Sequence, residues 1–280
     1  MVVTENDLAP FGAFPPTGLQ AGLMAAGRRL QPNWFGRRMA SFIRSSLKRL
    51  GNGPVDAEVI GQKMRLYPCD NAGEKRLLAT PQFFNPVEME LLSRYVTPGF
   101  VFIDVGANVG AYTVFVGRRA GATGRVIAIE PHPAPRARLM ANLKLNELSN
   151  VTVAPVAISN RDGEIVLYAD GHNLGSTSIH ADWSPYKGGG AIRAPMKTLQ
   201  GLLAEHGVTR IDGIKIDIEG AEDDALAPFL EHADDASLPR LVIIEDNRNK
   251  WRIDLVALLQ SKKYRAKFER GGNMIFTRGE

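Results

Sequence analysis

Residues 101–130 constrain the fold of this chain more than any other stretch. They open with a short apolar run, which is typical of a strand buried on both faces, and continue into a glycine-containing turn, residues 106–110. Apolar residues at helical spacing then predict a helix, and a second apolar run ends at Glu130. The segment therefore predicts strand, turn, helix and strand, the first half of a nucleotide-binding α/β unit.

The residue types at the turn indicate a bound ligand. Gly106 has no Cβ, so the backbone there can approach a ligand closely, and Gly110 lets the helix pack tightly against the strand. Glu130 follows Gly106 by 24 positions, at the tip of the neighbouring strand. A carboxylate at that place can accept two hydrogen bonds from a ribose diol.

Two features of the turn favour a cationic ligand without phosphate. Asn108 stands where a dinucleotide-binding motif has its second glycine, and Asp104 places negative charge at the strand end. S-adenosylmethionine carries an amino group and a sulfonium and no phosphate, so it is the predicted ligand. An NAD-dependent enzyme and a non-catalytic α/β scaffold remain alternatives.

Further acids follow two later strands. The predicted fourth strand runs into Asp217 and Glu219, which share a side if the strand continues through them, and the next runs into Glu245 and Asp246. Ligands in open α/β sheets bind at the carboxyl ends of strands, so we expect these acids beside Glu130. Asp217, Glu245 and Asp246 would also suit Mg²⁺, although the pattern assigns no metal.

Length and composition set the broad class. At 280 residues the chain can hold one large domain and an appendage, and its single cysteine, Cys69, excludes an internal disulfide. Transmembrane and secretory segments are not expected, because no apolar run reaches about 18 residues and the first residues are rich in proline and contain acids. These features predict a cytoplasmic location.

Basic charge is concentrated at the start of the chain. Residues 1–55 hold seven bases and two acids, whereas the remainder holds 27 bases and 28 acids. Residues 33–50 predict a basic amphipathic helix, which either packs on the main domain or attaches to an anionic membrane or a partner. Nothing supports nucleic acid as a partner. The expected division is an N-terminal helical extension, residues 1–53, and a catalytic domain, residues 54–280.

The remaining pattern completes a sheet. Residues 151–157 predict the third strand, residues 160–163 a hairpin turn, residues 170–178 a polar loop and residues 181–195 a second exposed loop. The C-terminal residues predict an antiparallel hairpin at the sheet edge. The sum is a Rossmann-like α/β fold with a seven-stranded, mostly parallel sheet.

This sheet resembles that of class I methyltransferases, and three motifs narrow the resemblance. The sequences DVGANVGAYT, EPHP and KIDIEGAE, at residues 104–113, 130–133 and 215–222, are similar to those of the FkbM family. Many members of that S-adenosylmethionine-dependent family O-methylate sugars or natural products. The resemblance covers residues 80–277, and it implies methylation of a glycan or secondary-metabolite hydroxyl, with a small-molecule or glycan acceptor as partner.

The resemblance also implies a set of site residues. The cofactor contacts are Asp104, Gly106, Asn108 and Gly110 for the methionine part, Glu130 for the ribose with His132 beside it, Ala157 for the adenine, and Asp217 and Glu219 near the methyl group.

A sugar hydroxyl is a weak nucleophile, so a base is expected, and the candidates are Asp217 first, then Glu219 and His172. Asp217 has the alternative of binding the cofactor amine only, and Glu219 that of a helix N-terminal charge. His172 is otherwise a solvent-exposed loop residue. Ser176 and Ser178 are candidate hydrogen-bond partners of a hydroxylated acceptor, and the sequence does not name that acceptor.

Overall fold

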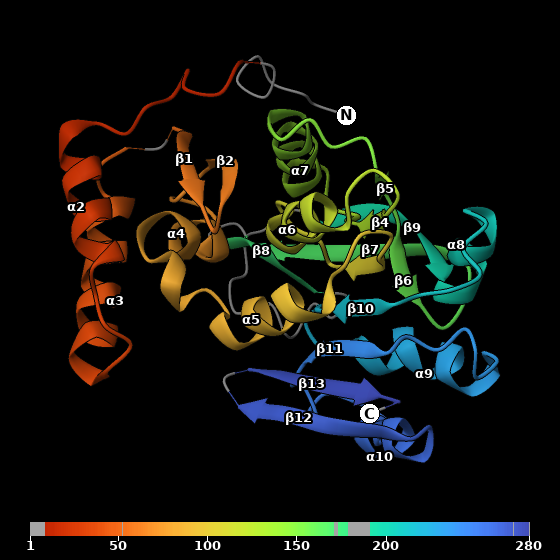
Figure 1. Ribbon diagram of the computed structural model, residues 1–280. Coiled ribbons are helices and arrows are strands. Elements are labelled where there is room, and N and C mark those ends of the chain that lie inside the picture. The colour runs from red at the N-terminus through yellow and green to blue at the C-terminus, as the bar shows by residue number, and fades with distance from the viewer. Residues whose placement is uncertain (1–8, 52, 171–172, 179–190, 271, 280) are drawn as a thin grey trace.

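The computed structural model describes residues 9–51, 53–170, 173–178, 191–270 and 272–279. Within these ranges a central sheet is covered by helices on both faces, and a second sheet and an N-terminal helical layer flank it (Figure 1).

The central sheet has seven strands in the order β12-β13-β11-β10-β3-β4-β5. Neighbours run parallel from β11 to β5, and β13 is antiparallel to both β11 and β12. The strands are β3 (Val101–Val105), β4 (Arg125–Ile129), β5 (Val151–Ala154), β10 (Gly213–Ile216), β11 (Leu241–Glu245), β12 (Tyr264–Arg270) and β13 (Asn273–Arg278). The expected mostly parallel sheet with an antiparallel C-terminal hairpin is confirmed.

Alternate residues of each strand bury their side chains in different layers, as the pleat of a strand requires. In β3, Phe102 packs in the core beneath α5 (Pro86–Tyr95) and α6 (Ala111–Ala120), whereas Ile103 packs in the core on the opposite face. That second core is completed by α8 (Leu199–Glu205), α9 (Glu222–His232) and α10 (Leu255–Ser261). The helix α7 (Pro133–Leu145) joins α6 over β4 through Leu139 and Leu143. The result is the expected α/β architecture, with helices on both faces of a mostly parallel sheet.

The second sheet and the chain leading into it correct four expectations. The order of the sheet is β6-β9-β7-β8, with β6 (Ala157–Ser159), β7 (Gly163–Asp170), β8 (Asn173–Ser178) and β9 (Ala191–Thr198). The expected third strand stops at Ala154, because Pro155 has no N–H with which to continue a ladder. Residues 160–163 do not form a hairpin turn, since β9 lies between β6 and β7. Residues 173–178, expected as loop, pair with β7, and residues 191–195 of the second expected loop belong to β9.

The N-terminal part forms a separate layer beside the sheet. It comprises α2 (Gly18–Arg28), α3 (Trp34–Lys48), the strand pair β1 (Val55–Val59) and β2 (Gln62–Leu66), α4 (Ala72–Ala79) and the 3₁₀ turn η1 (Pro81–Phe83). Figure 1 shows α2 and α3 on the outer side of α4, away from the central sheet. The boundary between residues 53 and 54 stays a prediction.

A buried ion pair holds the start of the described chain to this layer. The guanidinium of Arg65 donates to Asp56 at 2.8 and 2.9 Å, and both side chains are almost fully buried. Arg65 also donates to the carbonyls of Ala9 and Pro10, and Asp56 accepts from the amide of Gly12. Residues 9–14 are therefore fixed by polar contacts to the strand pair.

None of the helices in the described ranges is long and apolar enough to cross a membrane.

Candidate active site

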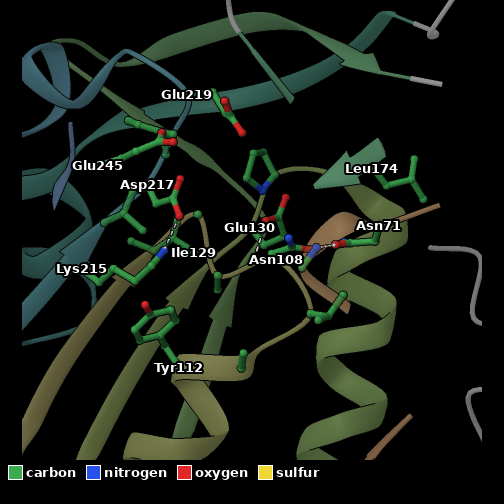
Figure 2. A pocket seen from close by; sticks show the side chains of 18 of the residues that line it. Asn71, Asn108, Tyr112, Ile129, Glu130, Leu174, Lys215, Asp217, Glu219 and Glu245 are labelled. Carbon is green, nitrogen blue, oxygen red and sulfur yellow. Dashed lines mark hydrogen bonds and ion pairs between the residues drawn. The ribbon is translucent and has the colours of Figure 1, made fainter. Parts of the chain in front are cut away.

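A cavity of about 320 Å³ opens at the carboxyl ends of β3, β4 and β10. That volume suits a small-molecule site. Figure 2 shows Asp217, Glu219 and Glu245 gathered on one side, with Glu130 and Asn108 opposite them. An apolar part is lined by Ile129, Val156, Ala157 and Ile158, and a further wall comes from α4 and β8 through Asn71, Asn173 and Leu174.

The turn after β3 is shaped by close backbone contact. Gly106 has a φ of +77°, and a Cβ there would lie 2.0 Å from the carbonyl oxygen of Asp217. Gly106 and Asn108 both line the cavity, and the side-chain oxygen of Asn108 accepts from Asn71 at 2.9 Å. Gly110 is not among the lining residues: a Cβ there would lie 2.4 Å from Leu139, so Gly110 serves the packing of α6 on α7.

Glu130 is a buried carboxylate at the tip of β4. Its two oxygens accept from the backbone amides of His132 at 2.8 Å and Asn108 at 2.9 Å. Burial nevertheless raises the pKa of Glu130 to about 7, because these hydrogen bonds do not fully replace the lost water. His132 does not line the cavity; its ring nitrogen accepts from the amide of Ala134 and caps α7.

Asp217 lies where β10 ends and is held by a buried lysine. The Nζ of Lys215 lies 3.2 Å from Asp217 and 3.9 Å from Asp104. The Asp217 side chain is 35% exposed, so it can meet a ligand in the cavity, whereas Asp104 is 1% exposed. Asp104 accepts a 2.6 Å hydrogen bond from Thr113 and does not line the cavity.

Comparison with known proteins gives the family. The family described as "Methyltransferase FkbM domain" matches residues 104–269, which is more than half of the chain and includes the turn after β3 and the acids after β4, β10 and β11. The chain belongs to the FkbM methyltransferase family. It is therefore an enzyme that transfers methyl groups, and the predicted resemblance is confirmed.

Individual relatives of this FkbM-family chain are distant. The chain is 29% identical to 31-O-demethyl-FK506 methyltransferase FkbM of Streptomyces tacrolimicus over 69% of its length and 77% of the relative. It is 26% identical to methyltransferase sdnD of Sordaria araneosa, covering 58% of this chain and 72% of the relative. The match to AMB antimetabolite synthetase AmbE of Pseudomonas aeruginosa, at 29% identity, spans 51% of this chain but only 8% of AmbE.

Solved structures resemble the chain more loosely. A SAM-dependent methyltransferase from Aquifex aeolicus is 14% identical, with a TM-score of 0.40, over 71% of this chain and 92% of that one. TYW2 of M. jannaschii, in complex with AdoMet, is 15% identical with a TM-score of 0.38, over 82% and 88%. The family assignment does not depend on them.

A buried polar network lies beneath the FkbM-family site. The hydroxyl of Tyr112 donates to Glu88 and accepts from Asn85 at 2.8 Å, and Lys215 lies 5.0 Å from the Tyr112 ring. Asn273 of β13 donates to the other oxygen of Glu88 at 2.7 Å. Elements far apart in the sequence are therefore joined directly under the cavity.

Like charges meet on the acidic side. Burial, together with the neighbouring charges of Asp217 and Glu219, raises the pKa of Glu245 to about 8. The strand β10 ends at Ile216, so Asp217 and Glu219 do not alternate along a strand as expected. Glu219 lies in a turn with a φ of +59°. It nevertheless lines the same cavity as Asp217.

Glu222 determines the path of that turn. It is fully buried and accepts from the amides of Ile218 and Gly220, from the indole of Trp251 at 2.8 Å and from Asn247 at 3.2 Å. The acid therefore fixes the turn that carries Glu219 and ties it to the segment after β11. The sequence offers only its place at the start of a helix as a signal.

Other predicted site residues are placed less centrally. Ala157 lines the cavity. Ser176 and Ser178 belong to β8, and His172 lies outside the described residues. Across the described ranges no group of three or more His, Cys, Asp or Glu side chains could hold a metal ion, and Asp246 is paired with Arg248 at 2.8 Å.

Several lining residues were missed in the sequence. Asn71 caps α4 by accepting from the amides of Gly73 and Glu74, which is the only role that its position before a helix suggests. The start of β8 is attached to the same region, because Asn173 accepts from the amide of Ala72 and the Leu174 amide donates to the carbonyl of Asp70. Such contacts between distant segments leave no local pattern in the sequence.

Proposed function

We propose that this enzyme transfers the methyl group of S-adenosylmethionine to a hydroxyl group of a small molecule or glycan. The observation that carries the proposal is the composition of one cavity. It joins the close-packed turn at Gly106, the buried acceptor Glu130 and the acidic side formed by Asp217, Glu219 and Glu245. An acidic site of this kind favours a cationic ligand over a nicotinamide dinucleotide, whose diphosphate is negatively charged.

The lining residues fit the parts of that cofactor. Glu130 is placed to accept hydrogen bonds from the ribose hydroxyls, and the apolar part around Ala157 suits the adenine. The backbone at Gly106 and Asn108 is open to the methionine part, and the acids Asp217 and Glu219 suit its positive charges. Asp104, Gly110 and His132 act from behind this surface, by charge or packing.

The cofactor supplies an electrophilic methyl group, and the chain's own residues prepare the acceptor. Asp217 is placed to accept a hydrogen bond from the acceptor hydroxyl and would take its proton as the acceptor oxygen receives the methyl group. Lys215 holds the Asp217 carboxylate in place at 3.2 Å. Burial and the neighbouring acids raise the pKa of Glu245 to about 8, which favours its protonated form at neutral pH.

The role of Asp217 is tested by Asp217→Asn. We expect turnover to fall by about 10²–10⁴-fold, the usual contribution of a positioned base. Affinity for S-adenosylhomocysteine should fall far less, because that product lacks the sulfonium charge. Asp246→Asn is the matched control, because Asp246 follows β11, pairs with Arg248 and does not line the cavity. Retained turnover in Asp217→Asn, measured by S-adenosylhomocysteine release, would remove Asp217 from the mechanism.

The choice of oxygen as acceptor is supported by one relative, whose name specifies O-methylation of 31-O-demethyl-FK506. Candidate acceptors would be incubated with a donor labelled with ¹³C in its methyl group, and NMR of the product distinguishes O-methyl from N-methyl carbon. Label on nitrogen would overturn the oxygen assignment and leave the methyl-transfer proposal intact. Binding of NAD in place of S-adenosylhomocysteine would contradict the whole proposal.

A further inference from the structure

The outer face of α3 exposes aromatic side chains that the fold does not use. The helix packs on the protein through Gly36, Ala40, Ile43 and Leu47. On its other side Trp34, Phe35 and Phe42 are 75%, 62% and 64% exposed. Among the described residues the other large exposed apolar side chains are Leu19 of the adjoining α2, at 72%, and Met140 and Ile253, at 39% and 43%.

Basic side chains lie between these aromatics. Trp34, Arg38 and Phe42 follow one another at intervals of four residues, so they form one line along the helix, and Arg38 lies 6.0 Å from the Trp34 ring. Arg37, Lys48 and Arg49 are exposed on neighbouring positions. The sequence has no acid between Asp7 and Asp56, and in the described part of the chain no salt bridge involves a base of α3.

The positive surface continues over α4 to the mouth of the cavity. The pKa of Lys75 is lowered by burial first and then by the positive charges of Lys48 and Arg44. The pKa of Arg44 is lowered by burial first and then by the charge of Arg76. Arg76 itself lines the cavity. An anion bound near these cations would reduce the repulsion between their like charges.

We propose that the outer face of α3, with the adjoining bases of α4, docks on an anionic membrane surface. Exposed aromatic rings enter the headgroup region of a bilayer, and arginine and lysine beside them meet anionic lipids. With 15 residues the helix is about 22 Å long. It lies along one side of the molecule, as Figure 1 shows, where its outer face can meet a flat surface. A second copy of the chain fits this face poorly, because an isologous contact would set bases against bases.

The experiment measures co-sedimentation of the full chain with vesicles of phosphatidylcholine alone and of phosphatidylcholine with phosphatidylglycerol. We expect binding to the anionic vesicles only, weakened at high salt. The triple variant Trp34→Ser, Phe35→Ser, Phe42→Ser and the charge variant Arg37→Glu, Arg38→Glu, Lys48→Glu should each reduce partitioning at least tenfold. Quenching of tryptophan fluorescence by brominated lipid should largely disappear in Trp34→Phe.

A matched control carries equivalent changes elsewhere. Ile253→Ser with Arg265→Glu removes an exposed apolar side chain and a base far from α3, and it should bind vesicles as the wild type does. Binding of S-adenosylhomocysteine by every variant verifies that it is folded. Wild-type protein that ignores anionic vesicles, or α3 variants that bind them unchanged, would overturn the proposal. So would α3 variants that only convert a dimer to a monomer, which would make the face a contact between copies.

Discussion

At the scale of single residues, the proposed contact between the buried carboxylate of Glu130 and the ribose predicts that ligand binding depends on pH. Its pKa is about 7 in the free protein, and ribose hydroxyls that donate to it would favour the ionised form and lower that pKa. Binding then releases a proton, so affinity for S-adenosylhomocysteine should rise between pH 6 and pH 8, by up to about tenfold. Calorimetry at both pH values measures this.

The control for this effect is Glu130→Gln, which keeps a hydrogen-bond acceptor but cannot titrate. Its affinity should be weaker by about 1–3 kcal/mol at pH 8 and should show no such rise. A wild-type affinity that is equal at pH 6 and pH 8 would contradict the assignment of Glu130 to the ribose.

The raised pKa of Glu245 predicts how the free energy of unfolding depends on pH. Its folded-state pKa, about 8, lies above the unfolded value of about 4.3, so the folded protein binds a proton that the unfolded chain releases. The free energy of unfolding therefore falls as pH rises from about 4.3 to 8. Glu245→Gln removes this loss and should raise stability by about 1–2 kcal/mol at pH 8, and by less at pH 5.

Thermal melts of both proteins at pH 5 and pH 8 would measure the difference. Glu90→Gln is the control, because the Glu90 side chain is 61% exposed and should leave the melts unchanged. Equal melting temperatures for Glu245→Gln and wild type at pH 8 would show that burial and the neighbouring acids do not destabilise the Glu245 carboxylate.

At the scale of elements, the meeting of two turns sets the shape of the site. A Cβ at Gly106 would lie 2.0 Å from the Asp217 carbonyl, and backbone cannot yield as a flexible side chain can. We expect Gly106→Ala to lose both cofactor binding and turnover, whereas Gly121→Ala, also at a positive φ but open around its Cβ, should cost only backbone strain of about 1–3 kcal/mol. Full activity in Gly106→Ala would mean that the two turns are not in contact.

Elements with strong local patterns could be predicted from the sequence. Apolar runs that end in acids predicted the parallel strands and the carboxylates at their tips. A strand that is buried on both faces needs a nearly continuous run of apolar residues, and such a run is easily recognised. The strand β8 could not be predicted, since Asn173–Ser178 is polar and its pairing with β7 is decided by tertiary contacts. The roles of Glu222 and Asn71 could not be predicted either, because each has a hydrogen-bond partner on a distant segment.

At the scale of the whole molecule, the pair of Arg65 and Asp56 decides how the N-terminal segment is held. Arg65→Met leaves the Asp56 carboxylate buried without its cation, and such a loss costs about 3–5 kcal/mol. We expect residues 9–14 to become sensitive to limited proteolysis and the melting temperature to fall. Arg94→Met, which breaks an exposed pair with Glu90, should change neither; an unaltered digestion pattern in Arg65→Met would contradict this role.

The helix α4 separates the outer helical layer from the cavity, with one side packed against α2 and α3 and the other lining the site through Asn71, Arg76 and Leu77. Any shift of α4 on attachment of α3 would alter the ligand's affinity. Thermodynamic linkage then makes the effect reciprocal: the factor by which attachment changes ligand affinity equals the factor by which the ligand changes attachment. If α3 attaches to a membrane as proposed, α4 is therefore the element through which attachment and ligand binding would affect each other.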